Sequence, residues 1–127
     1  MQTIKKILVI DSDSVCVFIL KQNFLLTELS PLWVHRSNAT DAIAYLTQND
    51  MPDLIFLDPV LPDMQQSQVF EKLNILDVFN KTKVSILTTY PEKEFGMLGN
   101  EFNILRKFSK PFHKNQLKEL LHDLKAA

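Results

Sequence analysis

Short apolar runs alternate along the chain with longer segments in which apolar residues recur every three or four positions. The short runs have the length and the branched residues of buried strands, and the longer segments have the spacing of one helix face. Strands are predicted at residues 4–10, 32–36, 53–57, 84–87 and 104–108. Helices are predicted from about Val15 to Leu29, from Ser37 to the turn at Asn49, from about Gln66 to Phe79, from Pro91 to about Asn100, and across Leu117–Leu124.

Strands that alternate with helices predict a parallel sheet covered by helices on both faces. The expected fold class is therefore α/β, with five parallel strands in the flavodoxin-like order 2-1-3-4-5. In such sheets the functional site lies beyond the carboxyl ends of the strands. The polar residues at these ends are Asp11, Ser12 and Asp13 after the first strand, Asp58 after the third, Thr88 after the fourth and Lys110 after the fifth. We expect these side chains to converge.

The composition limits the classes of function open to the chain. Its 127 residues, 46% of them hydrophobic, predict one domain (residues 1–127) with a substantial core and no effector domain. A net charge of −1 without a basic stripe argues against a direct nucleic-acid partner. No apolar run approaches the roughly 20 residues of a membrane span. The single cysteine, Cys16, fits a reducing cytoplasm rather than a disulfide framework.

Acids at strand ends are compatible with two kinds of phosphoryl chemistry. The stretch DSDSV at residues 11–15 fits the first motif of a haloacid-dehalogenase-type phosphatase, with Asp11 as nucleophile and Asp13 as general acid and base. The late pair of acids that holds Mg²⁺ in that class is missing, because the acids near the end of the chain fall inside the last predicted helix. That class also leaves the sequence around Asp58 unexplained.

In the second chemistry, Asp58 receives a phosphoryl group. A carboxylate beside a divalent cation, a hydroxyl and an ammonium group can do so, because the two cations neutralise charge on the transferring group. Mg²⁺ prefers hard oxygen ligands and keeps several waters. The residues after Asp58, PVLPDM, form a stiff loop that could turn a backbone carbonyl, that of Val60, toward the metal. The sequence favours this phosphoacceptor over the phosphatase.

Four motifs make the chain resemble the receiver domains of two-component response regulators over nearly all of its length. They are ILVIDSD at the first strand, PDLIFLDPVLPDM around Asp58, VSILTT at the fourth strand and KPF from Lys110. The resemblance implies that Asp58 is the phosphoacceptor, that Thr88 is the switch hydroxyl with Thr89 beside it, and that Lys110 contacts the phosphate. It also implies a cis Lys110–Pro111 peptide bond.

The same resemblance implies a cofactor and partners. Mg²⁺ would be held by Asp11, Asp58 and the Val60 backbone carbonyl, with Ser12 or Asp13 completing the set. The phosphoryl donor would be a sensor histidine kinase or a histidine phosphotransfer protein. Output would pass to a downstream protein partner, and a homodimer is compatible with this role. Such a domain is no enzyme beyond self-phosphorylation and slow self-dephosphorylation.

Four positions depart from the usual receiver pattern, and one of them, Gln66 in place of a frequent glycine, weakens the match only slightly. Ser12 stands where a second acid usually binds the metal, and its neutral hydroxyl is a weaker ligand than a carboxylate. Lys107 occupies a place that is often aromatic, and a lysine could not be buried there without a penalty. Thr89 replaces a smaller residue and is expected to narrow access to Asp58. Ser12 therefore supports an alternative, a pseudo-receiver that acts as a phosphorylation-independent interaction module.

The first predicted helix is more apolar than one core-facing stripe requires. Residues 15–20 read VCVFIL, which is apolar on every side of a helix. Two interpretations stay open: a bulky core, or a helix that also offers a surface to a partner.

Overall fold

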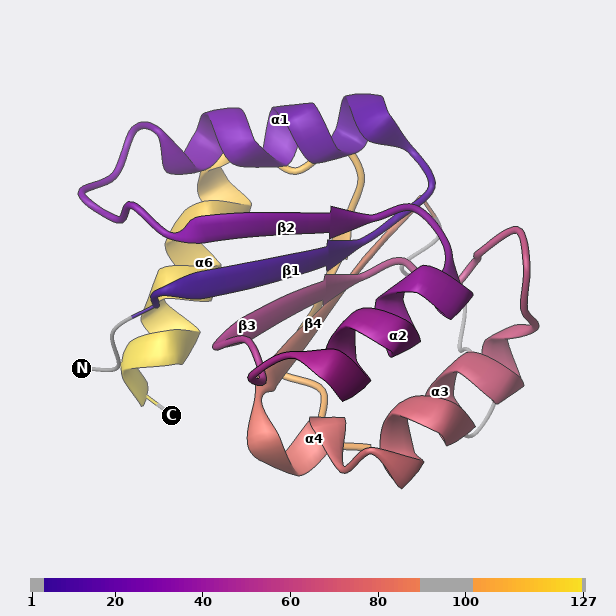
Figure 1. The fold of residues 1–127 in the computed structure, drawn as a ribbon. Coiled ribbons are helices and arrows are strands. Elements are labelled where there is room, and N and C mark those ends of the chain that lie inside the picture. Colours follow the sequence, from indigo (N-terminus) through magenta and orange to yellow (C-terminus); the bar gives the residue numbers. More distant parts are fainter. Residues whose placement is uncertain (1–3, 90–101, 127) are drawn as a thin grey trace.

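The computed structural model describes residues 4–89 and 102–126 (Figure 1). The strands are β1 (Lys6–Ile10), β2 (Leu32–Arg36), β3 (Leu54–Leu57), β4 (Lys83–Thr88) and β5 (Arg106–Ser109). The helices are α1 (Ser14–Phe24), α2 (Ala39–Gln48), α3 (Gln66–Ile75), α4 (Val78–Lys81) and α6 (Lys114–Ala126). The helix predicted from Pro91 to about Asn100 lies outside the described residues. Within the described ranges, no helix is long and apolar enough to cross a membrane.

The strands form one parallel sheet in the order β2-β1-β3-β4-β5, which confirms the predicted fold class. β1 lies inside the sheet, where Leu8 pairs with Val34 of β2 on one side and with Ile55 of β3 on the other. β1, β3 and β4 each have strand neighbours on both sides and side chains buried on both faces. Their sequences are therefore nearly continuous apolar runs, the pattern from which they were predicted.

Each face of the sheet has its own core, because successive strand residues point to opposite faces. Ile7 and Val9 of β1 pack into the cluster that contains the buried residues of α1 and α6. Leu8 and Ile10 pack into the cluster that contains those of α2, α3 and α4. Figure 1 shows the same division, with α1 and α6 on one side of the sheet and α2, α3 and α4 on the other.

Several element boundaries differ from the prediction, among them the end of α1 and the starts of β1 and β5. α1 ends at Phe24 and not near Leu29, because the following turn closes on the helix end: the Thr27 hydroxyl donates to the Phe24 carbonyl at 2.7 Å. β1 and β5 each begin two residues later than predicted, at Lys6 and Arg106. None of these shifts moves a strand's carboxyl end away from the polar residues that follow it.

The segment predicted as one helix, residues 66–79, forms two. α3 ends at Ile75, and Asp77 adopts a left-handed backbone conformation with φ of 60°. Aspartate is among the few residues that adopt this conformation readily as a single turn residue. The turn redirects the chain so that Val78 and Phe79 of α4 are buried.

The apolar surface of α1 is only partly used by the core. Val17, Leu20 and Phe24 are buried against the sheet. Val15 and Phe18, one helical turn apart on the outer side, are 65% and 61% exposed. A bulky core therefore does not account for the whole apolar run, and an exposed apolar stripe remains on this helix.

Candidate functional site

Three charged side chains meet beyond the carboxyl ends of β1, β3 and β5. The Lys110 ammonium lies 2.7 Å from Asp58 Oδ2, and 3.0 and 2.9 Å from the two carboxylate oxygens of Asp11. Asp11 and Asp58 are buried, and the Lys110 side chain is 8% exposed. Residues 52 and 99 positions apart in the sequence thus form one compact ion-pair cluster.

The parallel sheet itself places these residues. The backbone N–H of Asp58 donates to the Ile10 carbonyl (2.9 Å), so the ladder between β1 and β3 continues to the first residue after β3. The backbone N–H of Lys110 donates in the same way to the Thr88 carbonyl (2.9 Å) at the end of β4. Because neighbouring parallel strands end together, the residues that follow them share one edge.

In this cluster, burial and ion pairing shift the pKa values of the side chains in opposite directions. Burial raises the pKa of Asp11, although the Asp13 N–H and the Lys110 ammonium act to lower it. Burial lowers the pKa of Lys110, but its hydrogen bonds to Asp58 and Asp11 outweigh burial, and the net effect is a raised pKa. Lys110 therefore stays protonated at neutral pH and neutralises charge in a site that water barely reaches.

The turn that carries Lys110 is held by a buried glutamine. The Lys110–Pro111 peptide bond is cis, as predicted. Gln116 of α6 donates to the backbone carbonyl (3.1 Å) and the hydroxyl (3.0 Å) of Ser109, and accepts from the backbone N–H of His113 (3.0 Å). Sequence reasoning missed Gln116. Its signal is a polar residue four positions before Leu120, on the buried face of α6.

Of the other predicted switch residues, Thr88 and Thr89 lie at the same carboxyl edge, whereas Lys107 lies within β5. Thr88 is buried at the end of β4, and Thr89 directly after it is exposed. Lys107 lies on β5 beside Ile86 of β4 and is also exposed. A lysine at this position is thus accommodated by facing outward rather than by burial.

Asp13 serves as the N-cap of α1. One of its carboxylate oxygens accepts from the backbone N–H groups of Val15 (3.1 Å) and Cys16 (3.2 Å). The Cys16 thiol donates to the other at 3.1 Å, and this contact is the main cause that lowers the pKa of Asp13. Burial, followed by this acid, raises the pKa of Cys16 to about 11, so the thiol remains protonated. These contacts make Asp13 the cap of α1.

The residues gathered here offer oxygen ligands of the kind that Mg²⁺ takes in proteins. Asp11 and Asp58 offer two carboxylates, and Mg²⁺ in proteins is commonly bound by one or two carboxylates and several waters. Ser12 is exposed and has only a neutral hydroxyl to offer. Across the part of the chain that the structure describes, no group of three or more His, Cys, Asp or Glu side chains is arranged to hold a metal ion.

Two further contacts steady the backbone around the carboxylates. The Val60 N–H donates to Asp58 Oδ1 at 2.9 Å, which holds the first turn of the loop after β3 against the acid. The His35 ring nitrogen Nε2 lies 2.8 Å from the backbone carbonyl of Asp11. The sequence alone did not single out His35. Its place opposite Val9 in the β1–β2 register is the signal that locates it beside the site.

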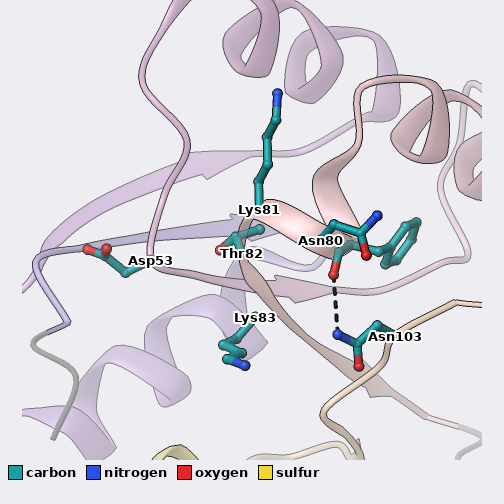
Figure 2. Close-up of a pocket in the computed structure, with 7 residues that line it drawn as sticks. Asp53, Asn80, Lys81, Thr82, Lys83 and Asn103 are labelled. Carbon is teal, nitrogen blue, oxygen red and sulfur yellow. Dashed lines mark hydrogen bonds between the residues drawn. The ribbon is translucent and has the colours of Figure 1, made fainter. Parts of the chain in front are cut away.

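A polar hollow lies at the opposite edge of the sheet, where β3 and β4 begin. Its volume is about 350 Å³, and its lining residues are Asp53, Phe79, Asn80, Lys81, Thr82, Lys83 and Asn103. Figure 2 shows Lys81 and Lys83 extending in opposite directions, while the Asn103 amide donates to the Phe79 carbonyl. These side chains do not converge on one point as the cluster at the carboxyl edge does.

Known proteins share this fold and sequence pattern. The family model described as response regulator receiver domain matches residues 7–122. The chain is 26% identical over 83 residues to sporulation initiation phosphotransferase F of Bacillus subtilis (strain 168), a match that covers 65% of this chain and 64% of that protein, less than two thirds of the relative's length.

Solved structures agree with this match. The fold is similar to that of a two-component response regulator from Legionella pneumophila, with a TM-score of 0.79, 20% identity, and coverage of 97% of this chain and 99% of that chain. It is also similar to the chemotaxis response regulator CheY4 of Vibrio cholerae, with a TM-score of 0.74, 19% identity, and coverage of 94% and 98%. Together with the family match, the five-stranded sheet and the cluster at its carboxyl edge, these likenesses lead to one conclusion: the chain belongs to the response regulator receiver domain family.

Proposed function

We propose that the protein accepts a phosphoryl group on Asp58 from a phosphohistidine of a sensor kinase or phosphotransfer protein, and signals through a protein partner. The observation that carries the proposal is the Lys110 ammonium held between two buried carboxylates. A receiver needs this arrangement, because a carboxylate can attack phosphorus only where the negative charge of the incoming group is neutralised. The name phosphotransferase, borne by the similar Bacillus subtilis protein, supports the same chemistry.

In the proposed step, an Asp58 carboxylate oxygen forms a bond to phosphorus as the bond from phosphorus to the donor's imidazole nitrogen breaks. The electron pair of the broken bond stays on that imidazole. Lys110 already contacts Asp58 Oδ2, so its ammonium is placed to bind a phosphoryl oxygen. The Val60 N–H fixes Asp58 Oδ1 and thereby orients the carboxylate. Asp11, Asp58 and the Val60 carbonyl would hold Mg²⁺, which supplies further charge neutralisation when bound.

The signal would leave through β4 and β5. We expect the Thr88 hydroxyl to bind a phosphoryl oxygen and thereby to shift β5 beside it, with Thr89 at the rim of the site. Lys107, exposed on β5, would lie on the surface that changes. This surface is the proposed contact for a downstream protein or for a second copy of the chain.

The donor would approach over α1. Val15 and Phe18 form an exposed apolar stripe on that helix, which begins three residues after Asp11. Val60, two residues after Asp58, is 52% exposed. Exposed apolar side chains next to the phosphoacceptor are what a docking protein would cover when it presents its histidine.

Ser12 and Asp13 support a second candidate function. Ser12 supplies no carboxylate, and Asp13 is engaged as the cap of α1, so neither replaces the second acid of the usual metal site. In this alternative the chain is a pseudo-receiver, whose surfaces bind partners whether or not Asp58 carries phosphate.

One experiment distinguishes the phosphoacceptor from the pseudo-receiver. The chain is incubated with acetyl phosphate and Mg²⁺ and its intact mass is measured. A covalent adduct of about 80 Da, lost in Asp58→Asn and kept in Asp53→Asn, supports the phosphoacceptor. The two aspartates flank β3, so they make a matched pair. An adduct that stays absent at high donor and Mg²⁺ concentration favours the pseudo-receiver. Phosphatase turnover that survives Asp58→Asn but disappears in Asp11→Asn would revive the phosphatase.

A further inference from the structure

The loop after Asp58 is tied to a helix from another part of the chain. Asp63 lies in this loop, and its Oδ1 accepts from the backbone N–H of Ala39 at 2.9 Å. Its Oδ2 accepts from the backbone N–H of Thr40 at 2.9 Å and from the Thr40 hydroxyl at 2.6 Å. The Thr40 hydroxyl and N–H lower the pKa of Asp63 to about 2, so the carboxylate is ionised at neutral pH.

The start of α2 does not depend on Asp63 for its own N-cap. Asn38 fills that role, since its side-chain oxygen accepts from the backbone N–H of Asp41 at 2.8 Å. A helix begins with several unpaired N–H groups, and Asn38 satisfies only one of them. Asp63 takes two others, those of Ala39 and Thr40, from 24 and 23 positions away. The contact is therefore a tether between two segments rather than a local cap.

The loop is held at two points with the proposed metal ligand between them. At its start, the Val60 N–H donates to Asp58 Oδ1. Near its end, Asp63 is bound to α2. Leu61 between them is buried, and it forms an isolated bridge with Met64. With both ends attached, the backbone at Val60 has little freedom to turn away from the carboxylate.

We propose that Asp63 is a positioning residue: its tether to the first turn of α2 holds the loop so that the Val60 backbone stays against Asp58. The chemical consequence rests on the proposed phosphoacceptor function, but the mechanical one does not. If Asp63 only stabilised α2, its loss would free the Ala39 and Thr40 amides and leave Val60 unchanged.

Asp53 provides a matched control. Its carboxylate also accepts two backbone N–H groups from a distant segment, those of Lys5 (2.8 Å) and Lys6 (3.0 Å). It does so at the amino edge of the sheet, away from Asp58. Substituting either aspartate removes a carboxylate tether of the same kind, and only one of the two borders the proposed site.

The first test measures amide hydrogen exchange in the wild type, Asp63→Ala and Asp53→Ala. The Ile86 amide, in the middle of β4, reports global opening and serves as reference. In Asp63→Ala, we expect the Val60 amide to exchange about tenfold faster relative to Ile86, together with Ala39 and Thr40. In Asp53→Ala the Val60 ratio should stay unchanged. A Val60 ratio that does not rise in Asp63→Ala overturns the proposal, as does an equal rise in both variants.

The second test measures the rate of adduct formation at saturating acetyl phosphate and Mg²⁺. Asp63→Ala should be slower by about tenfold, because a displaced carboxylate and carbonyl reduce the fraction of productive geometry. Asp53→Ala should remain within about twofold. Asp63→Asn, which keeps the shape and one acceptor oxygen, should recover part of the rate. Failure of the wild type to form any adduct would refute the proposed function, while the exchange measurement would still decide the role of Asp63.

Discussion

The two edges of the sheet carry similar residues, but the charged ones are buried and paired at one edge and not at the other. Asp53 and Asp58 flank β3, while Thr82 directly precedes β4 and Thr88 is its last residue. At the carboxyl edge, acids and lysine are buried together within 3.0 Å. At the amino edge, Asp53 binds backbone N–H groups, and no ion pair joins Lys83 to an acid among residues 4–89 and 102–126. Residue type alone therefore does not make a site.

Burial explains the difference. At the carboxyl edge Asp11 and Asp58 are buried, so water has little access to these acids. A buried charge must be paired, so Lys110 and the two carboxylates hold one another. At the amino edge a hollow of about 350 Å³ admits water, and a hydrated charge needs no partner.

The largest effect is expected from removing the lysine. Lys110→Met leaves two buried carboxylates without a counterion, so its free energy of unfolding should fall by about 3 kcal/mol at pH 7 in the presence of chelator. Lys83→Met, at the amino edge, should stay within about 0.5 kcal/mol of the wild type. Urea unfolding of the three proteins checks this. The gap should narrow toward pH 4, because the unneutralised carboxyls take up protons. Equal losses in both variants would contradict the comparison.

A smaller effect is expected from restoring an acid at position 12. Ser12→Asp should tighten Mg²⁺ binding on the order of tenfold, or about 1.4 kcal/mol, because a carboxylate replaces a neutral oxygen beside Asp11. Ser12→Ala is the control and should stay within about twofold of the wild type, since the hydroxyl is a weak ligand. Isothermal titration calorimetry with MgCl₂ measures all three. Unchanged affinity in Ser12→Asp would mean that residue 12 does not face the metal.

The smallest effect is expected at the amino edge. The Thr82 hydroxyl oxygen is buried and has no hydrogen-bond partner among the described residues. Thr82→Val keeps the shape and removes this unsatisfied group, so its free energy of unfolding should equal or exceed that of the wild type by up to about 1 kcal/mol. Thermal and urea unfolding provide the measurement. A loss above about 1 kcal/mol would show that the hydroxyl has a partner, such as water in the hollow.

Strand positions were predictable and helix ends were not. β3 and β4 are apolar runs because both faces of these strands are buried, so their positions can be recognised from the residue types alone. The end of α1 was placed too late because Leu25 and Leu26 look like core residues, yet they are 71% and 77% exposed. The break at Asp77 depends on one residue in the left-handed conformation, which the helical spacing of the apolar residues around it does not predict.

In the candidate site, too, some residues could be predicted from the sequence and others could not. Asp11, Asp58 and Lys110 could be located because each follows a recognisable strand, and the parallel sheet brings strand ends together. Asp63 and Gln116 were missed as tethers. Most of their partners are backbone groups. Because backbone groups are the same at every position, the sequence pattern does not predict which of them a side chain will contact.

By itself, the sequence determined the order of strands and helices, the parallel sheet, and the group of acids and lysine at its carboxyl edge, because apolar periodicity follows from burial. Tertiary structure alone decided that Asp13 caps α1, that Lys107 faces outward, and that Asp63 holds the loop beside Asp58. The physical reason is that a polar side chain could form hydrogen bonds of similar free energy with several partners. The packed fold determines which of these partners lies within hydrogen-bonding distance.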